Sequence, residues 1–328
     1  MSRLFSILIT GSHRSGTTWV GKVISQSENI LYIPDPFQPN GLLRRSYQLD
    51  MWYKYFRVNQ GKIFQKHLQR ISTFNYSYKE AFHLKNRLPE TDYRNPNGMY
   101  TNHFNYRNTP WRIRYYMDCL HAKFSANPKN TIPLFKDPIA LFSSKWFHLN
   151  MNSKNIILIR HPAAFVSSLK RVGWQFDFRN FTNQPSLMDD ILSTFKTNIQ
   201  NSSDDIIETG SILWNCIHHA IYQFQNEFPD WIYIKHEDLS INPMVEFENI
   251  FNSINLPFTS NVKDYIVLTT SSENQAEVTK SGNIHQLKRD SKKSIKNWKN
   301  RLTSNEIKKI YKLTSPVSQH FYSDEDWK

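Results

Sequence analysis

A short run of glycine, hydroxyl and cationic residues near the start of the chain has the composition of an anion-binding loop. The run covers residues 11–19 and reads Gly-Ser-His-Arg-Ser-Gly-Thr-Thr-Trp. Backbone N–H groups in such a turn, at the start of a helix, can converge on a phosphate. Arg14 can offer a fork of donors to anionic oxygens, and the hydroxyls of Thr17 and Thr18 can donate as well. The run therefore predicts a phosphate-binding loop.

The residue after the second glycine separates this loop from that of ordinary ATPases. Gly11 and Gly16 are spaced as in GxxxxGK[ST], but Thr17 occupies the lysine position. The cation lies inside the loop instead, at Arg14. This argues against an ordinary ATPase or kinase. The structural alternative, a glycine turn with an exposed arginine, is disfavoured because an apolar run precedes the loop and a helical pattern follows it.

A second arginine at the end of a predicted strand lies in the middle of the chain. Arg160 ends the apolar run 155–160, and Ser168 follows eight positions later, in a helical stretch that begins after Pro162. An arginine can grip a phosphate with two charge-assisted hydrogen bonds, and a serine can add a neutral donor. Taken alone, Arg160 is equally a surface arginine at the end of a strand.

Together the two sites resemble those of sulfotransferases that use 3′-phosphoadenosine 5′-phosphosulfate (PAPS). The loop is similar to the family's 5′-phosphosulfate loop, and the pair Arg160 and Ser168 to its 3′-phosphate site. The resemblance implies that Trp19 stacks on adenine. The alternative is that Trp19 is an aromatic residue of the core at the start of the helix. The cofactor-binding residues that it implies are Ser12, His13, Arg14, Ser15, Gly16, Thr17, Thr18, Trp19, Arg160, Ser168, His236, Lys292 and Lys293.

The last three of these residues come from two weaker likenesses. His236, in Lys-His-Glu-Asp-Leu at 235–239, stands where the family commonly has a tyrosine near adenine. An ordinary surface histidine is the alternative. Lys292 and Lys293 lie in a basic stretch that resembles the family's 3′-phosphate loop, and a solvated basic helix is the alternative.

Sulfuryl transfer needs cations beside the transferred group and a base for the acceptor proton. Lys136 resembles the family lysine that touches the sulfuryl group, and Arg14 is the second cation. Small-molecule sulfotransferases carry a histidine base two places after that lysine, but here Pro138 stands there. Asp35, in Pro-Asp-Pro-Phe, resembles the glutamate base of glycan and bacterial sulfotransferases. A turn-forming aspartate is the alternative reading of Asp35, and Asp137 is the second candidate base.

The elements that must position these residues alternate along the chain. Strands are predicted for the apolar runs 4–10, 30–33, 155–160 and 231–235. Helical spacing is found at 16–27, 162–171, 212–228 and 243–254. This order predicts an α/β fold with a central parallel sheet flanked by helices, in the P-loop-like architecture that the resemblance implies.

The remaining segments predict where an acceptor binds. We expect a single domain over 1–328, with inserted helices and loops at 38–130 and a polar, mobile insertion at 173–210. The first insertion is rich in arginine and aromatic residues, a combination that suits sugar rings or flat aromatic molecules. The expected acceptor is a hydroxyl or amine of a glycan, glycolipid or hydroxylated metabolite.

Composition limits the partners. The 328 residues include 41 Lys and Arg against 28 Asp and Glu, a net charge of +13, which favours an anionic partner. No apolar run approaches the roughly 20 residues of a membrane helix, and the start of the chain leaves no room for a leader, so we expect a cytoplasmic protein. We expect PAPS as donor, adenosine 3′,5′-bisphosphate (PAP) as product, no metal and no nucleic acid. The alternatives are a P-loop small-molecule kinase and a non-catalytic protein that binds anions or nucleic acid.

Overall fold

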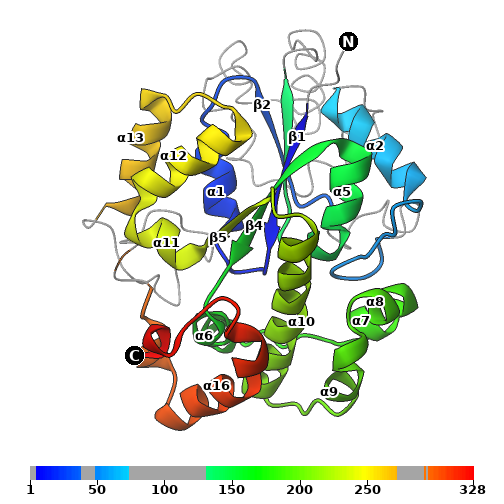
Figure 1. Cartoon of the computed structure of the whole chain (residues 1–328), viewed down its shortest axis with the longest axis vertical. Coiled ribbons are helices and arrows are strands. Elements are labelled where there is room, and N and C mark those ends of the chain that lie inside the picture. Colours follow the sequence, from blue (N-terminus) through cyan, green and yellow to red (C-terminus); the bar gives the residue numbers. More distant parts are fainter. Residues whose placement is uncertain (1–4, 38–48, 74–130, 272–291, 293–294) are drawn as a thin grey trace, which may run out of the picture.

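A parallel sheet forms the centre of the molecule. The computed structural model describes residues 5–37, 49–73, 131–271, 292 and 295–328. Its sheet has five strands in the order β2-β3-β1-β4-β5, and every neighbouring pair is parallel (Figure 1). The strands are β1 (Ser6–Gly11), β2 (Ile30–Pro34), β3 (Ile132–Lys136), β4 (Ser153–Ile159) and β5 (Ile232–Lys235). The predicted fold class is confirmed.

Helices cover both faces of the sheet (Figure 1). The α-helices are α1 (Thr17–Ile24), α2 (Lys62–Ser72), α5 (Ser144–Met151), α6 (Pro162–Val172), α7 (Arg179–Thr182), α8 (Pro185–Asp190), α9 (Lys196–Gln200), α10 (Ile206–Glu227), α11 (His236–Ile241), α12 (Pro243–Ile254), α13 (Ser260–Thr270), α15 (Trp298–Arg301) and α16 (Ser304–Ser318). Short 3₁₀ turns cover Leu141–Ser143, Ser193–Phe195 and Asp324–Trp327.

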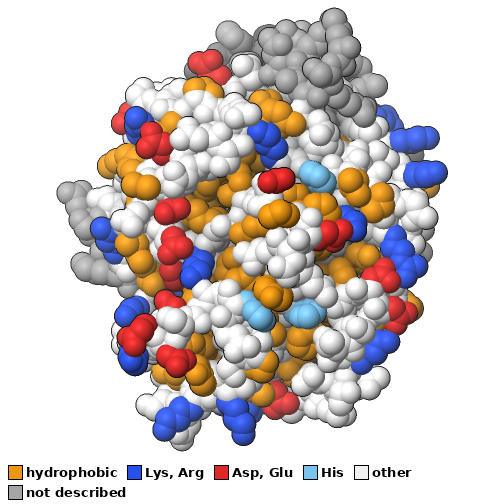
Figure 2. All heavy atoms as spheres, in the orientation of Figure 1, with side chains coloured by type: hydrophobic (Ala, Val, Ile, Leu, Met, Phe, Trp, Pro, Cys, Tyr) orange, Lys and Arg blue, Asp and Glu red, His pale blue; other side chains and the backbone are white. Residues whose placement is uncertain are grey.

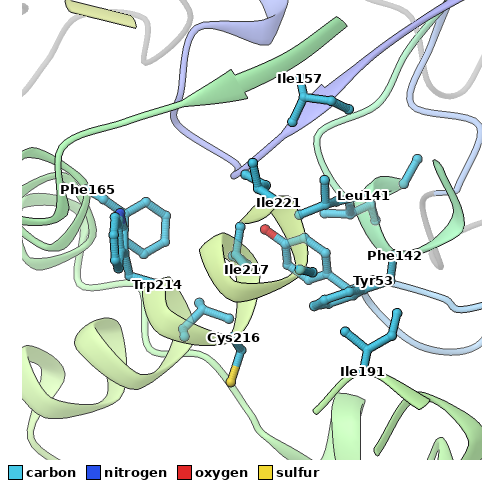
Figure 3. Close-up of a cluster of buried hydrophobic side chains, with 14 of the residues drawn as sticks. Tyr53, Leu141, Phe142, Ile157, Phe165, Ile191, Trp214, Cys216, Ile217 and Ile221 are labelled. Carbon is cyan, nitrogen blue, oxygen red and sulfur yellow. The ribbon is translucent and has the colours of Figure 1, made fainter. Parts of the chain in front are cut away.

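Alternate residues of the strands enter two separate apolar layers. In β4, Ile156 and Leu158 pack with α1, α12 and α13, whereas Ile157 and Ile159 pack with α5, α6 and α10. This is the pattern of a strand buried on both faces, and it explains why β4 is apolar at successive positions. Figure 3 shows part of the second layer, where α10 places Ile217 beside the residues around Tyr53.

Strand β3 was not predicted. It is short, and Pro133 at its second position lacks the N–H that a central strand uses for pairing. Within the sheet β3 nevertheless pairs on both sides, with Ile9 of β1 and Pro34 of β2 opposite Lys136. The strand matters because its last residue is the predicted sulfuryl-contacting lysine.

The prediction of a polar, mobile insertion at 173–210 is wrong. The segment forms α7, α8 and α9, and its apolar side chains join the core, including Phe176, Phe181, Leu187 and Leu192. These apolar residues were not recognised in the sequence because they are separated by polar residues and follow neither helical nor strand spacing over a long window. Helix α10 also begins at Ile206 rather than 212, because the Asp205 side chain caps it by accepting from the Ile207 N–H at 3.0 Å.

Of the predicted insertion at 38–130, only 49–73 is described, and it contains loop and helix α2 as expected. Residues 38–48 and 74–130 lie outside the described residues. Across the segments that are described, we find no helix with the length and apolar character of a membrane span.

Candidate functional site

The predicted site residues follow the carboxyl ends of the strands. Strand β1 ends at Gly11 before the loop, β2 ends before Asp35 and β3 ends at Lys136. Strand β4 ends before Arg160, and β5 before His236. In parallel sheets these ends lie at one edge, where ligands of α/β proteins bind. Motifs spread over most of the chain therefore meet at one edge of the sheet.

The loop between β1 and α1 is shaped by its glycines. Gly11 has φ +142°, and a Cβ there would lie 2.3 Å from the Leu158 carbonyl oxygen of β4, so only glycine fits. Gly16 has φ +94° and precedes α1, and a Cβ there would lie 2.7 Å from Nδ1 of His236. Arg14 itself adopts the left-handed region, with φ 68°. The backbone is thus folded tightly at the start of α1, as the phosphate-loop prediction requires.

The hydroxyl residues of this loop differ in exposure. Ser12 and Ser15 are fully buried, and the Ser15 hydroxyl donates to the Ser12 carbonyl at 2.5 Å, which closes the turn. Thr17 is buried at the start of α1, whereas Thr18 is partly exposed. The serines therefore shape the loop, and Thr18 presents the more accessible hydroxyl.

The two predicted phosphate-binding sites are in direct contact. Nε of Arg14 donates to the hydroxyl of Ser168 at 3.1 Å. The Arg160 guanidinium donates through Nη1 to the carbonyl oxygen of Arg14. Two guanidinium groups and one hydroxyl from separate elements therefore meet beside the start of α1. An anion can satisfy this cluster because guanidinium forks match the oxygens of phosphate and sulfate.

The predicted catalytic cation and base form an ion pair. Nζ of Lys136 lies 2.6 Å from Oδ1 of Asp35, and their side chains are 6% and 32% exposed. Asp35 has φ 47°, and its N–H donates to the Lys136 carbonyl at 2.7 Å. The parallel register of β2 and β3 places Pro34 opposite Lys136, so the next residue of β2 can reach the lysine. The register between β2 and β3 therefore brings Asp35 and Lys136 together.

Asp137, the second candidate base, is fully buried and anchors the turn that carries Asp35. Its carboxylate accepts from the Phe37 N–H at 2.6 Å and from the Ile139 N–H at 3.0 Å. Burial, followed by the nearby charge of Asp35, raises the pKa of Asp137 above its ordinary value. The geometry gives this carboxylate a structural role and leaves Asp35 as the more exposed acid.

The side chain of His13 packs inside the protein. Its Nδ1 lies 2.6 Å from the Tyr53 hydroxyl, and its ring packs against Phe165 and Trp174 at centroid distances of 5.1 and 4.9 Å. Burial, with a smaller contribution from the charge of Arg14, lowers the pKa of His13 to about 3. The imidazole is therefore neutral and lies in an aromatic cluster, and its role in cofactor binding stays a prediction.

Trp19 is also a packing residue. It is 8% exposed, its indole N–H donates to Thr269 at 3.1 Å, and its ring meets Phe247 edge to face at 5.2 Å. This matches the core-aromatic alternative. Its stacking on adenine stays a prediction.

The three remaining predicted residues, His236, Lys292 and Lys293, differ in their surroundings. His236 is partly buried over Gly16 and lies edge-on to Trp19, with ring centroids 6.3 Å apart. Lys292 is exposed, and Lys293 lies outside the described residues.

Sequence reasoning missed several residues that support the site. The Glu237 carboxylate accepts from the His161 N–H at 3.1 Å and from the Tyr322 hydroxyl at 2.9 Å, and burial raises its pKa. It thereby fixes the backbone that follows Arg160. Trp52 and Tyr53 belong to the aromatic residues of the insertion predicted to form the acceptor site, but their place around His13 was not predicted. The sequence distinguishes them only by the aromatic composition of their segment, and composition does not predict which residues they contact.

Comparison with known protein families gives a match over almost the whole chain. The model of the sulfotransferase domain family matches residues 5–321. No curated protein matches the chain.

Solved structures that resemble the chain include three sulfotransferases. One is the sulfotransferase domain from the curacin biosynthetic pathway, with 15% identity, a TM-score of 0.49, and 96% of this chain and 99% of that chain covered. Another is the sulfotransferase domain of the Synechococcus olefin synthase, with 13% identity, a TM-score of 0.47, and 97% and 94% covered. A sulfotransferase from Mycobacterium avium has 11% identity, a TM-score of 0.44, and 98% and 78% covered.

Proposed function

The chain belongs to the sulfotransferase domain family, and we propose that it transfers a sulfuryl group from PAPS to a hydroxyl or amine of an acceptor. The proposed acceptor is a glycan, a glycolipid or a hydroxylated metabolite.

One observation carries the choice of PAPS as donor. Arg14, Arg160 and Ser168 come from a loop, a strand end and a helix, and they meet beside the start of α1. PAPS bears anionic groups at both its 5′ and 3′ positions, so it needs two sets of cationic donors close together. This cluster has the chemistry for both, with Arg14 assigned to the 5′-phosphosulfate and Arg160 with Ser168 to the 3′-phosphate.

In the proposed reaction, PAPS supplies a sulfuryl group activated by its bond to the 5′-phosphate. The new sulfur–oxygen bond to the acceptor forms as the bond from sulfur to the phosphate oxygen breaks, and PAP leaves. Asp35 takes the proton of the acceptor group. Lys136 and Arg14 offer positive charge to the oxygens on which negative charge grows. Asp137 holds the turn that carries Asp35.

We propose that the acceptor binds against the aromatic residues beside the loop. Trp52 and Trp174 both contact His13, at centroid distances of 6.3 and 4.9 Å, and they contact each other at 5.0 Å. They come from the two segments predicted as insertions. An aromatic wall of this kind suits the apolar face of a sugar or a flat ring.

The two alternatives make different demands. A kinase needs a cation for the β- and γ-phosphates, whereas Thr17 stands at the lysine position of the loop. A nucleic-acid-binding protein is expected to gather its basic residues on one face. On the face shown in Figure 2, blue basic and red acidic side chains are interspersed among the described residues.

The test is calorimetric binding of PAP, with adenosine 5′-monophosphate (AMP) and Mg·ATP as competitors. We expect PAP to bind in the micromolar range and to be displaced poorly by both competitors. Tighter binding of Mg·ATP would favour the kinase, and absence of PAP binding would remove the PAPS assignment. Turnover is then measured with PAPS and a panel of glycans, glycolipids and phenols, with PAP release as the readout.

A further inference from the structure

The backbone of Arg160 is held on both sides by helix α10. The indole N–H of Trp214 donates to the Arg160 carbonyl at 2.8 Å. The Arg160 N–H points to Nε2 of His218 at 3.5 Å. Arg160 follows the last residue of β4, so these contacts replace the strand partners that a backbone group loses at a strand end.

The state of His218 is fixed by its other nitrogen. Nδ1 lies 2.9 Å from the carbonyl oxygen of Trp214, which can only accept, so Nδ1 carries the proton and Nε2 is an acceptor toward Arg160. His218 is fully buried, and burial lowers its pKa to about 3, so the ring is neutral. Its ring stacks on Trp214, with centroids 3.9 Å apart and planes at 14°. The two side chains form one stacked pair on α10.

The same arginine reaches the phosphate loop with its side chain. Its Nη1 donates to the carbonyl of Arg14, and Arg14 in turn donates to Ser168 at 3.1 Å. A shift of the Arg160 backbone therefore moves the guanidinium relative to both neighbours. Helix α10 is a long, buried element that packs on α6 and α16, so it can serve as a fixed reference for this arginine.

We propose that Trp214 and His218 are positioning residues that aim Arg160 at the 3′-phosphate, and that selectivity for a 3′-phosphorylated nucleotide depends on them. The inference rests on the proposed function, because it assigns Arg160 to that phosphate. Neither side chain is assigned contact with the nucleotide.

The test is the ratio of the affinities for PAP and AMP, measured by calorimetry in the full-length protein. Trp214→Phe keeps an aromatic ring but removes the N–H donor. We expect PAP affinity to fall about five- to tenfold, with AMP affinity unchanged. A matched control is Trp146→Phe, because the Trp146 indole is equally buried and donates to the Gln60 carbonyl at 2.9 Å. The control should lower the melting temperature to a similar extent and leave the PAP to AMP ratio unchanged.

A second pair of variants keeps the test decisive if Trp214→Phe does not fold. His218→Gln retains an acceptor oxygen for the Arg160 N–H, whereas His218→Leu has none. We expect the PAP to AMP ratio to fall in His218→Leu and to be retained in His218→Gln.

Several outcomes would overturn the inference. These are an equal loss of PAP and AMP affinity in Trp214→Phe, an unchanged ratio in both Trp214→Phe and His218→Leu, or the same loss of ratio in Trp146→Phe. Failure of the proposed function looks different, because the wild-type protein itself would then show no preference for PAP over AMP.

Discussion

Arg14 donates through Nε to the hydroxyl of Ser168 at 3.1 Å, across 154 positions of the sequence. One residue belongs to the loop after the first strand, and the other to helix α6 after the fourth. Each was singled out from a separate motif. Their contact shows that the two motifs form one cluster of donors, which Arg160 completes by donating to the Arg14 carbonyl.

This cluster predicts how PAP affinity responds to its removal. Arg160→Ala should weaken PAP binding about 10- to 100-fold, because a charge-assisted pair is lost, and Ser168→Ala should weaken it about five- to tenfold. Calorimetry with PAP and AMP measures both. AMP affinity should change little in either variant, and unchanged PAP affinity in Arg160→Ala would remove its role at the 3′-phosphate.

Asp35→Asn should separate chemistry from binding. The amide cannot take the acceptor proton, so turnover should fall by about two to four powers of ten while PAP affinity is retained. Steady-state rates with PAPS and calorimetry with PAP provide the two readouts. Asp189→Asn, at an exposed aspartate paired with Lys196, is the control and should leave turnover unchanged. Near-normal turnover in Asp35→Asn would reassign the base.

Asp137→Asn should act mainly on stability. The Phe37 and Ile139 N–H groups donate to different oxygens of Asp137, and asparagine would place an NH2 group at one of these two positions. The free energy of unfolding should therefore fall by about 1–3 kcal/mol. Turnover should fall less than in Asp35→Asn, because only the placement of Asp35 is affected. Denaturant unfolding and steady-state rates check both parts. A larger loss of turnover than in Asp35→Asn, at unchanged stability, would make Asp137 the base.

Lys136→Met should lower turnover about 100- to 1000-fold with a smaller effect on PAP affinity. Methionine keeps most of the buried stem, which packs so closely on α1 that a Cβ at Gly21 would lie 3.1 Å from Cγ of Lys136. The loss therefore reports the missing charge rather than a cavity. Rates and PAP affinities that fall by the same factor would restrict Lys136 to nucleotide binding.

Buried histidines should make the protein sensitive to acid. Burial lowers the pKa of His13, His161 and His218 to about 3. The unfolded chain binds these protons near pH 6.5, whereas the folded chain does not. Their contribution to stability is therefore complete above pH 6.5 and is lost as the pH falls toward 3.

His161→Phe tests this sign at one position. His161 is enclosed by Trp298, Tyr322 and Trp327, so an aromatic ring suits the site. Between pH 6 and 4, the free energy of unfolding of the variant should fall less steeply than that of the wild type, by about 1.4 kcal/mol per pH unit. Urea unfolding at several pH values measures the two slopes. Equal slopes would mean that His161 is protonated in the folded protein.

The sequence allowed prediction of the elements whose signals are local. The apolar runs of β1, β2, β4 and β5, the glycine loop and helix α12 were found, and the resemblance to sulfotransferases is confirmed. Strand β3 was missed because Pro133 contradicts a central strand and the neighbours that stabilise it are distant in sequence.

The sequence predicted the cationic residues of the site better than the orientation of its aromatic residues. Arg14 was identified by residue type and position in the loop, and Arg160 and Ser168 by their resemblance to the family's 3′-phosphate site. The structure brings the three together. His13 and Trp19 stand inside the same motif but face the core, and no local pattern reveals which way a side chain points. Trp214 and His218 were missed because their partner, Arg160, is on another element.

The pairing of Asp35 with Lys136 depends on β2, which is the outermost strand on its side of the sheet formed by the described residues. Outer strands open locally more readily than central ones, without unfolding of the whole domain. A brief detachment of β2 would separate the acid from the lysine, while the proposed nucleotide-binding cluster at the ends of β1 and β4 and on α6 stayed intact. Mild denaturant would then produce molecules that still capture the donor but do not turn over, and faster amide hydrogen exchange in β2 than in β4 would accompany them.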